Sequence, residues 1–166
     1  NALQGDAAFA DILGRMGCRI ERRHDGVRVT GRATKGIDID LSDMSDLVPT
    51  LAAVAPFVAT PTRITGVGFI RNKESDRIGD LVRGLRTLGV TAEENDDGLT
   101  VMPLSRTGAE TSSSPVRVHD DHRLAMAWSL LALVIPGVEI DDAEVVGKSW
   151  PEWWNVRSTL LGGRSR

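Results

Sequence analysis

The chain has 166 residues, of which 41% are hydrophobic and 26% charged, with a formal net charge of −3 at pH 7. This composition is that of a globular chain and excludes a disordered or fibrous one. The acidic balance argues against a nucleic-acid-binding surface and no apolar run is long enough to span a membrane, so neither nucleic acid nor a membrane is expected as a partner.

The chain carries one cysteine, Cys18, which excludes an internal disulfide and is typical of a reducing compartment. We therefore expect a cytoplasmic protein, with Cys18 buried in the core as free cysteines usually are. The sequence opens at Asn1 without an initiating methionine or a signal peptide, which indicates a piece of a longer protein. Residues 162–166 have no apolar pattern and are expected to form a disordered tail.

The first part of the chain alternates between helical and strand patterns. The spacing of apolar residues predicts a helix over 9–16, strands over 18–21, 27–30 and 37–41, a helix over 47–58 and a strand over 63–67. Gly17 ends the first helix, and Asp25-Gly26 joins the first two strands as a hairpin. Residues 47–58 are almost wholly apolar, which predicts a buried helix that Pro56 should end early.

The same order of elements recurs in the second part of the chain. The pattern there predicts a helix over 78–88, strands over 90–93, 99–101 and 116–118, an apolar helix over 124–135 and a strand over 138–140. Gly17 and Gly89, which end corresponding helices, are 72 residues apart, and so are the turn glycines Gly26 and Gly98. The chain therefore contains an internal repeat.

This repeat predicts an α/β fold built from βαβαββ units, with buried parallel strand pairs and with hairpins at the sheet edge. Two units are expected, over about 5–70 and 71–161. Residues 106–115 are rich in Ser, Thr and Gly and are expected to form a surface loop.

Acidic and basic residues recur at equivalent points of the two units. Asp46 and Asp121 are 75 residues apart, and so are Lys73 and Lys148. Two such matches in one register favour a pseudo-symmetric scaffold whose loops bring these side chains together. Asp46 and Asp121 each precede an apolar helix, so each is a candidate N-cap, and Asp46 is also a candidate proton acceptor at the edge of the interior.

The run 71–77 carries three cations and two carboxylates at what we predict to be the first turn of a helix. Cations there oppose the helix dipole unless an anion binds over them, so Lys73 and Arg77 indicate a phosphate or carboxylate site. Glu74 and Asp76 beside them are candidates for proton transfer. The alternative is a solvated helix face with weak ion pairs.

Arg123 precedes the second apolar helix, where its burial is costly unless Asp121 or a ligand anion pairs with it. Lys148 lies in a third cation-bearing loop that the topology should bring close to the other two. His122 is able to transfer protons, but a lone histidine at a helix start is more often structural. His119 and His122 do not have the spacing of metal ligands, so no metal is expected.

Three motifs resemble the C-terminal part of the EPSP synthase family, the 3-phosphoshikimate 1-carboxyvinyltransferases. They are Lys73-Glu74-Ser75-Asp76-Arg77, Asp121-His122-Arg123-Leu124-Ala125-Met126 and Gly147-Lys148-Ser149-Trp150-Pro151. The resemblance runs essentially from end to end and implies the enolpyruvate transferase fold. It also implies a transferase of the shikimate pathway, which moves the enolpyruvyl group of phosphoenolpyruvate to the 5-hydroxyl of shikimate 3-phosphate without a metal or cofactor.

The resemblance implies a role for each candidate residue. Asp46 matches the residue that contacts shikimate 3-phosphate and accepts a proton, and Lys73 matches a second contact to that substrate. Glu74 matches the residue that transfers a proton to the methylene carbon. The cations that match the phosphoenolpyruvate contacts are Arg77, Arg123 and Lys148, with Asp121 and His122 expected to support them.

The sequence departs from the family pattern at Phe69, where some members have an asparagine that faces the substrate. The family closes two domains on its substrates and has three folding units in each domain, whereas we expect two units here. The missing N-terminal domain of the same enzyme is therefore an expected partner. The isolated chain is expected to fold without turning over.

Other readings stay open at this point. UDP-N-acetylglucosamine enolpyruvyl transferase shares the repeat architecture, although the motifs at 73–77 and 121–123 favour EPSP synthases. A non-catalytic module that binds phosphate or RNA ends would also use such cations, but the acidic charge counts against RNA. A purely structural domain would point Lys73, Arg123 and Lys148 toward separate surfaces.

Overall fold

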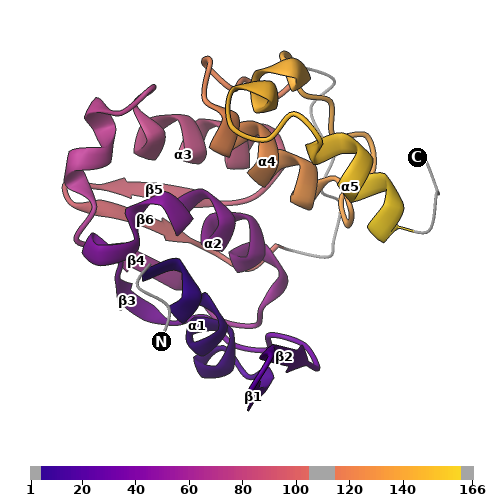
Figure 1. The fold of residues 1–166 in the computed structure, drawn as a ribbon. Helices are drawn as coiled ribbons and strands as arrows, with labels where there is room; N and C mark the ends of the chain where they lie inside the picture. Colours follow the sequence, from indigo (N-terminus) through magenta and orange to yellow (C-terminus); the bar gives the residue numbers. More distant parts are fainter. Residues whose placement is uncertain (1–4, 105–114, 162–166) are drawn as a thin grey trace.

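The computed structural model describes residues 5–104 and 115–161 (Figure 1). The α-helices in these ranges are α1 (Phe9–Arg15), α2 (Val48–Val54), α3 (Arg77–Thr87), α4 (His122–Leu131) and α5 (Trp153–Leu160). The strands are β1 (Arg19–Arg23), β2 (Gly26–Thr30), β3 (Asp38–Asp40), β4 (Thr62–Thr65), β5 (Ala92–Asn95) and β6 (Gly98–Val101). Short 3-10 turns include η2 (Ser42–Leu47), η3 (Ala55–Phe57), η4 (Gly68–Asn72) and η5 (Ala143–Lys148). The predicted tail and all but the last residue of the predicted 106–115 loop lie outside the described residues.

A four-stranded sheet with the strand order β3-β4-β6-β5 organises the fold. Strands β3 and β4 are parallel and are joined by α2, whereas β6 is antiparallel to both β4 and β5. The chain order β3-α2-β4-α3-β5-β6 is a complete βαβαββ unit, over residues 38–101. The hairpin β5–β6 leaves β5 at the edge of the sheet, as expected from the sequence.

Parts of the same unit recur on either side of it. Before it, α1 leads into the antiparallel hairpin β1–β2, as α3 leads into β5–β6. After it, Val116, which precedes α4 in the chain, forms a parallel bridge with Ile140, which follows α4. In the same way, β3 and β4, which precede and follow α2, pair in parallel. The central sheet thus contains two strands that precede residue 70, the predicted boundary between the units, and two that follow it. The division into units at 5–70 and 71–161 stays a prediction.

The C-terminal ends of three helices follow the sequence signals. Gly17 after α1 has φ of 115° and Gly89 after α3 has φ of 76°, both in the left-handed region that side chains rarely adopt. Helix α2 stops at Val54, and the 3-10 turn η3 follows, because Pro56 cannot continue the α-helical hydrogen bonding.

The apolar core includes residues of α2, α3 and α4. Leu51 of α2 and Trp128 of α4 are fully buried, and Gly84 of α3 lies against Trp128, where a Cβ would come within 2.4 Å of a ring carbon. Cys18 is only partly buried, so the prediction that it lies in the core is wrong; it precedes a hairpin whose side chains are mostly exposed. Every helix in the described ranges is too short or too polar to cross a bilayer.

The β1–β2 hairpin lies beside α1 at one end of the molecule, whereas α4 and α5 gather toward the other (Figure 1). Val29 of β2 and Val101 of β6 occupy equivalent positions of the repeat, but Val29 is 41% exposed and Val101 is fully buried. The difference arises because β6 lies between two strands, whereas β2 pairs with β1 alone in the described chain.

This equivalence gives a matched test of the core. We expect Val101→Ala to lower the free energy of unfolding by about 2 kcal/mol, because two methyl groups leave a packed interior. The same substitution at Val29 should cost less than about 0.5 kcal/mol. Urea denaturation followed by circular dichroism measures both. Equal losses would contradict the burial difference between the two strands.

Candidate active site

The run 71–77 does not form one helical turn. Residues 71–76 precede α3, which begins at Arg77, so the prediction that the whole run lies in the first turn is wrong. The reason is Asp76, whose carboxylate accepts the backbone N–H of Gly79 at 3.1 Å and so caps the helix. Nη1 of Arg71 lies 3.1 Å from Asp76 and 3.0 Å from Glu94, which fixes the segment against β5.

Arg77 is the centre of the candidate site. Its side chain is only 1% exposed and is enclosed by three carboxylates. Nε donates to Asp121 at 2.6 Å, Nη1 to Asp46 at 3.0 Å and Nη2 to Glu74 at 2.6 Å. Burial by itself lowers the pKa of Arg77, but the hydrogen bond to Asp121 and the charges of Asp121, Glu74 and Asp46 outweigh it and raise that pKa above its usual value.

Asp46 links this arginine to a second one. Its other carboxylate oxygen lies 2.6 Å from Nη2 of Arg123, the second residue of α4. The N-cap of α2 is Leu47, so Asp46 does not cap that helix. We expected Asp121 or a ligand to pair with the Arg123 side chain, and the structure shows that the partner is Asp46. Asp46, Glu74, Arg77, Asp121 and Arg123 are called the carboxylate–arginine network below.

Asp121 is fully buried and has two functions in the structure. It caps α4, because Oδ1 accepts the backbone N–H of Arg123 at 2.9 Å, which confirms the N-cap expectation. It also holds Nε of Arg77 through its second oxygen. The side chain therefore ties the start of α4 to the start of α3.

The remaining candidates lie around this network. Lys148 is ion-paired with the carboxylate of Asp120 and donates to its backbone oxygen at 3.3 Å, one residue before Asp121. Asp120 was not singled out from the sequence, although its place directly before Asp121 was a usable signal. Lys73 is exposed, and its Nζ lies 6.0 Å from the centroid of the Phe69 ring. His122 is partly buried at the first residue of α4.

Two of the four predicted cations, Arg77 and Arg123, are therefore linked through Asp46. Lys148 is paired with Asp120. Within residues 5–104 and 115–161, Lys73 has no carboxylate partner. In the same ranges no three His, Cys, Asp or Glu side chains are grouped as a metal site would require. The arrangement offers partly exposed carboxylates for proton transfer beside cations that can bind anions.

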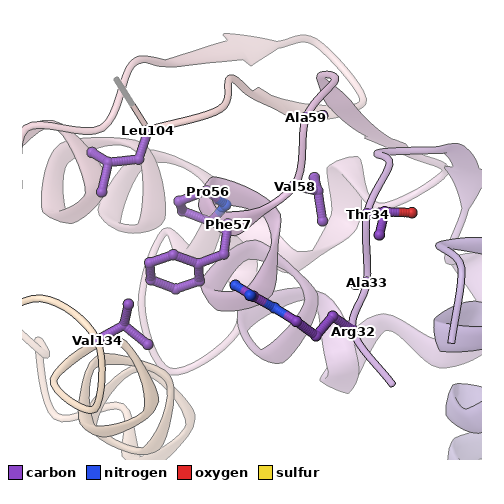
Figure 2. A pocket seen from close by; sticks show the side chains of 9 residues that line it. All are labelled: Arg32, Ala33, Thr34, Pro56, Phe57, Val58, Ala59, Leu104 and Val134. Atoms are coloured by element: carbon purple, nitrogen blue, oxygen red, sulfur yellow. The ribbon is translucent and has the colours of Figure 1, made fainter. Parts of the chain in front are cut away.

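A separate cavity of about 620 Å³ lies away from these residues (Figure 2). Arg32 and Phe57 point into it, and Leu104 and Val134 form part of its wall. None of the network residues lines it.

Residues 1–156 match the family model described as EPSP synthase (3-phosphoshikimate 1-carboxyvinyltransferase). The 3-phosphoshikimate 1-carboxyvinyltransferase of Syntrophobacter fumaroxidans is 47% identical over 162 residues, which are 96% of this chain and 37% of that protein. The enzyme of the same name from Nostoc punctiforme is 43% identical over 152 residues, covering 91% of this chain and 34% of that one.

A solved EPSP synthase structure from Acinetobacter baumannii aligns with a TM-score of 0.76 and 24% identity, over 90% of this chain and 37% of the other. This likeness confirms the predicted α/β fold. The chain spans about a third of the length of these curated relatives.

Proposed function

The chain belongs to the EPSP synthase family, and from this membership we propose that it supplies half of an active site for enolpyruvyl transfer. The reaction moves the enolpyruvyl group of phosphoenolpyruvate to the 5-hydroxyl of shikimate 3-phosphate and releases phosphate. The observation that carries the proposal is the sharing of Asp46 between Arg77 and Arg123, which come from separate helix starts. We place the reaction in the cytoplasm, without a cofactor, as part of the shikimate pathway of aromatic amino-acid synthesis.

Asp46 and Glu74 divide the proton transfers in this proposal. The 5-hydroxyl oxygen attacks C2 of phosphoenolpyruvate and gives its proton to Asp46, while Glu74 delivers a proton to C3. Expulsion of phosphate from C2 then requires removal of a proton from C3, which returns to Glu74. Both carboxylates are about two-fifths exposed and accept hydrogen bonds from Arg77, so they are held toward solvent in fixed positions.

The cations neutralise two highly charged substrates. Arg123 and Lys148 are partly exposed and bind phosphoenolpyruvate in our proposal, which requires the anion to replace Asp46 and Asp120 as their partners. That exchange would free an oxygen of Asp46 to accept the proton. Arg77 as a direct ligand stays a prediction, because its donors already contact three carboxylates.

Lys73 would contact shikimate 3-phosphate, since its ammonium group is exposed beside Phe69. Asp121 holds Arg77 in place for the reaction, and His122 stays a supporting candidate. The rest of the site would come from the N-terminal domain that the family resemblance implies, since this chain spans only about a third of the length of the relatives. For this reason we expect the isolated chain to release no phosphate when both substrates are supplied.

A chimera tests the proposed function. The chain would replace the matching 162-residue segment of the Syntrophobacter fumaroxidans enzyme, with which it is 47% identical. We expect phosphate release that needs both phosphoenolpyruvate and shikimate 3-phosphate, measured with a coupled phosphate assay. A chimera that is folded by circular dichroism but inactive would contradict the proposal. Activity with UDP-N-acetylglucosamine in place of shikimate 3-phosphate would favour the rival enolpyruvyl transferase.

A further inference from the structure

A second charged cluster lies between α3 and the turn at 118–121, outside the carboxylate–arginine network. Asp80 on the first turn of α3 is 4% exposed. Its Oδ1 lies 2.5 Å from Nη2 of Arg83 and 3.2 Å from Nε2 of His119. A carboxylate that is this buried is costly unless it is paired. The proposed reaction uses none of these three side chains.

The turn that carries His119 is strained. His119 has φ of 48° and Asp120 has φ of 63°, and these are the non-glycine residues with positive φ in the described chain. Two consecutive side-chain-bearing residues in the left-handed region persist only where surrounding contacts hold them. The turn is also closed by the backbone N–H of Asp121, which donates to the oxygen of Val118 at 2.8 Å.

The strained turn delivers two residues to the site. Asp120 is ion-paired with Lys148, and Asp121, which follows it, holds Arg77. Helix α3 contacts this turn at two points: Arg77 pairs with Asp121, and Asp80 lies beside His119. Both contacts come from the first turn of the helix, because Arg77 and Asp80 are three residues apart. One contact alone would leave the turn free to pivot, whereas two contacts fix its orientation relative to α3.

We propose that Asp80 and His119 are a positioning pair, which holds the 118–121 turn so that Asp120 keeps Lys148 in place for the anionic substrate and Asp121 keeps Arg77 in place. The link to substrate rests on the proposed function, but the link to the turn does not. Neither residue touches the reacting atoms. Their contribution is to maintain a backbone conformation that the turn would otherwise leave.

Charged groups from two segments surround His119. Asp80 and Arg83 lie on α3, Arg117 and Asp120 lie on its own segment, and a cavity of about 320 Å³ opens between Arg83, Arg117 and His119.

Hydrogen exchange of the 166-residue chain tests the proposal without any substrate. His119→Asn removes the tether but keeps a residue that tolerates positive φ. We expect the Asp121 amide to exchange about tenfold faster in this variant, and equally faster in Asp80→Asn. The double variant should exchange no faster than either single one, because both changes remove the same contact. His24→Asn and Asp96→Asn, in exposed hairpin turns, are the matched controls.

Unchanged protection of the Asp121 amide in both single variants would overturn the proposal. Loss of the whole fold in both variants would also overturn it, since the pair would then stabilise the core rather than the turn.

Kinetics in the chimera test the link to substrate. We expect Asp80→Asn and His119→Asn to raise KM for phosphoenolpyruvate about fivefold, with kcat within about twofold. The reason is that Lys148 loses its position together with Asp120, whereas Arg77 still holds the carboxylates that transfer protons. A lower kcat at unchanged KM would overturn this link. An inactive chimera would count against the proposed function, whereas the hydrogen-exchange result would still decide the role of the pair.

Discussion

Replacing Asp121 by alanine is expected to lower the free energy of unfolding by about 3–5 kcal/mol, the largest loss that we predict for a single substitution. Asp121 is fully buried, and its partner Arg77 is only 1% exposed. A guanidinium stays charged at any working pH, so Arg77 cannot escape the unpaired state by losing a proton. The loss of the α4 cap adds about 1 kcal/mol. Urea denaturation, followed through the buried Trp128, measures the change.

Two asparagine substitutions separate the contribution of the ion pair with Arg77 from that of the α4 cap. Asp121→Asn keeps an oxygen that can cap α4 but removes the charge that Arg77 requires, so we expect most of the loss to remain. Asp120→Asn is the matched control, because its carboxylate is largely exposed and its pair with Lys148 should contribute less than about 1 kcal/mol. If Asp121→Ala cost no more than this control, Asp46 and Glu74 would be sufficient partners for Arg77.

The fold was largely predictable because its signals are local. Gly17 and Gly89 require backbone conformations that only glycine adopts readily, and the apolar segments after Asp46 and Asp121 have no polar face to expose. Such signals act over a few residues and repeat along the chain. The periodicity placed this helix at 78–88, close to α3, but the charged run 71–77 was wrongly assigned to its first turn, because the capping side chain, Asp76, was interpreted as part of that run.

The site was predictable in its members but not in its pairing. Asp46 and Asp121 occupy equivalent positions of the repeat, yet Asp121 caps a helix and Asp46 bridges two arginines. The bridge to Arg123 joins residues 77 positions apart, and no local pattern indicates which distant carboxylate an arginine will meet. The exposure of Cys18 was missed for a similar reason, since burial depends on what packs over a segment.

The network also changes how the cations are expected to bind substrate. The sequence predicted arginines that are unpaired until an anion binds, whereas the structure shows arginines already paired with carboxylates of the same chain. Pairing lowers the cost of holding Arg77 inside the protein before substrate arrives. A substrate anion must then compete with Asp46 for Arg123, which couples substrate binding to the release of the proposed proton acceptor.

Asp46→Asn in the chimera is expected to lower kcat by about 100- to 1,000-fold, because the amide has the size of the carboxylate but cannot accept the hydroxyl proton. The substitution also removes the group that competes for Arg123, so KM for phosphoenolpyruvate should stay the same or fall. The fold should tolerate the change, since Asp46 is partly exposed and Arg77 keeps Asp121 and Glu74 as partners. Steady-state phosphate release at varied substrate concentrations measures both constants.

Asp43→Asn is the matched control for this substitution, because Asp43 is exposed on the same 3-10 turn. We expect its kcat to stay within about twofold of the unmodified chimera. If Asp46→Asn raised KM and left kcat unchanged, Asp46 would be a binding group and another residue would accept the proton. A fall in kcat with unchanged or lower KM would distinguish a proton acceptor from a group that only shields Arg123, because loss of shielding alone cannot slow the chemical step.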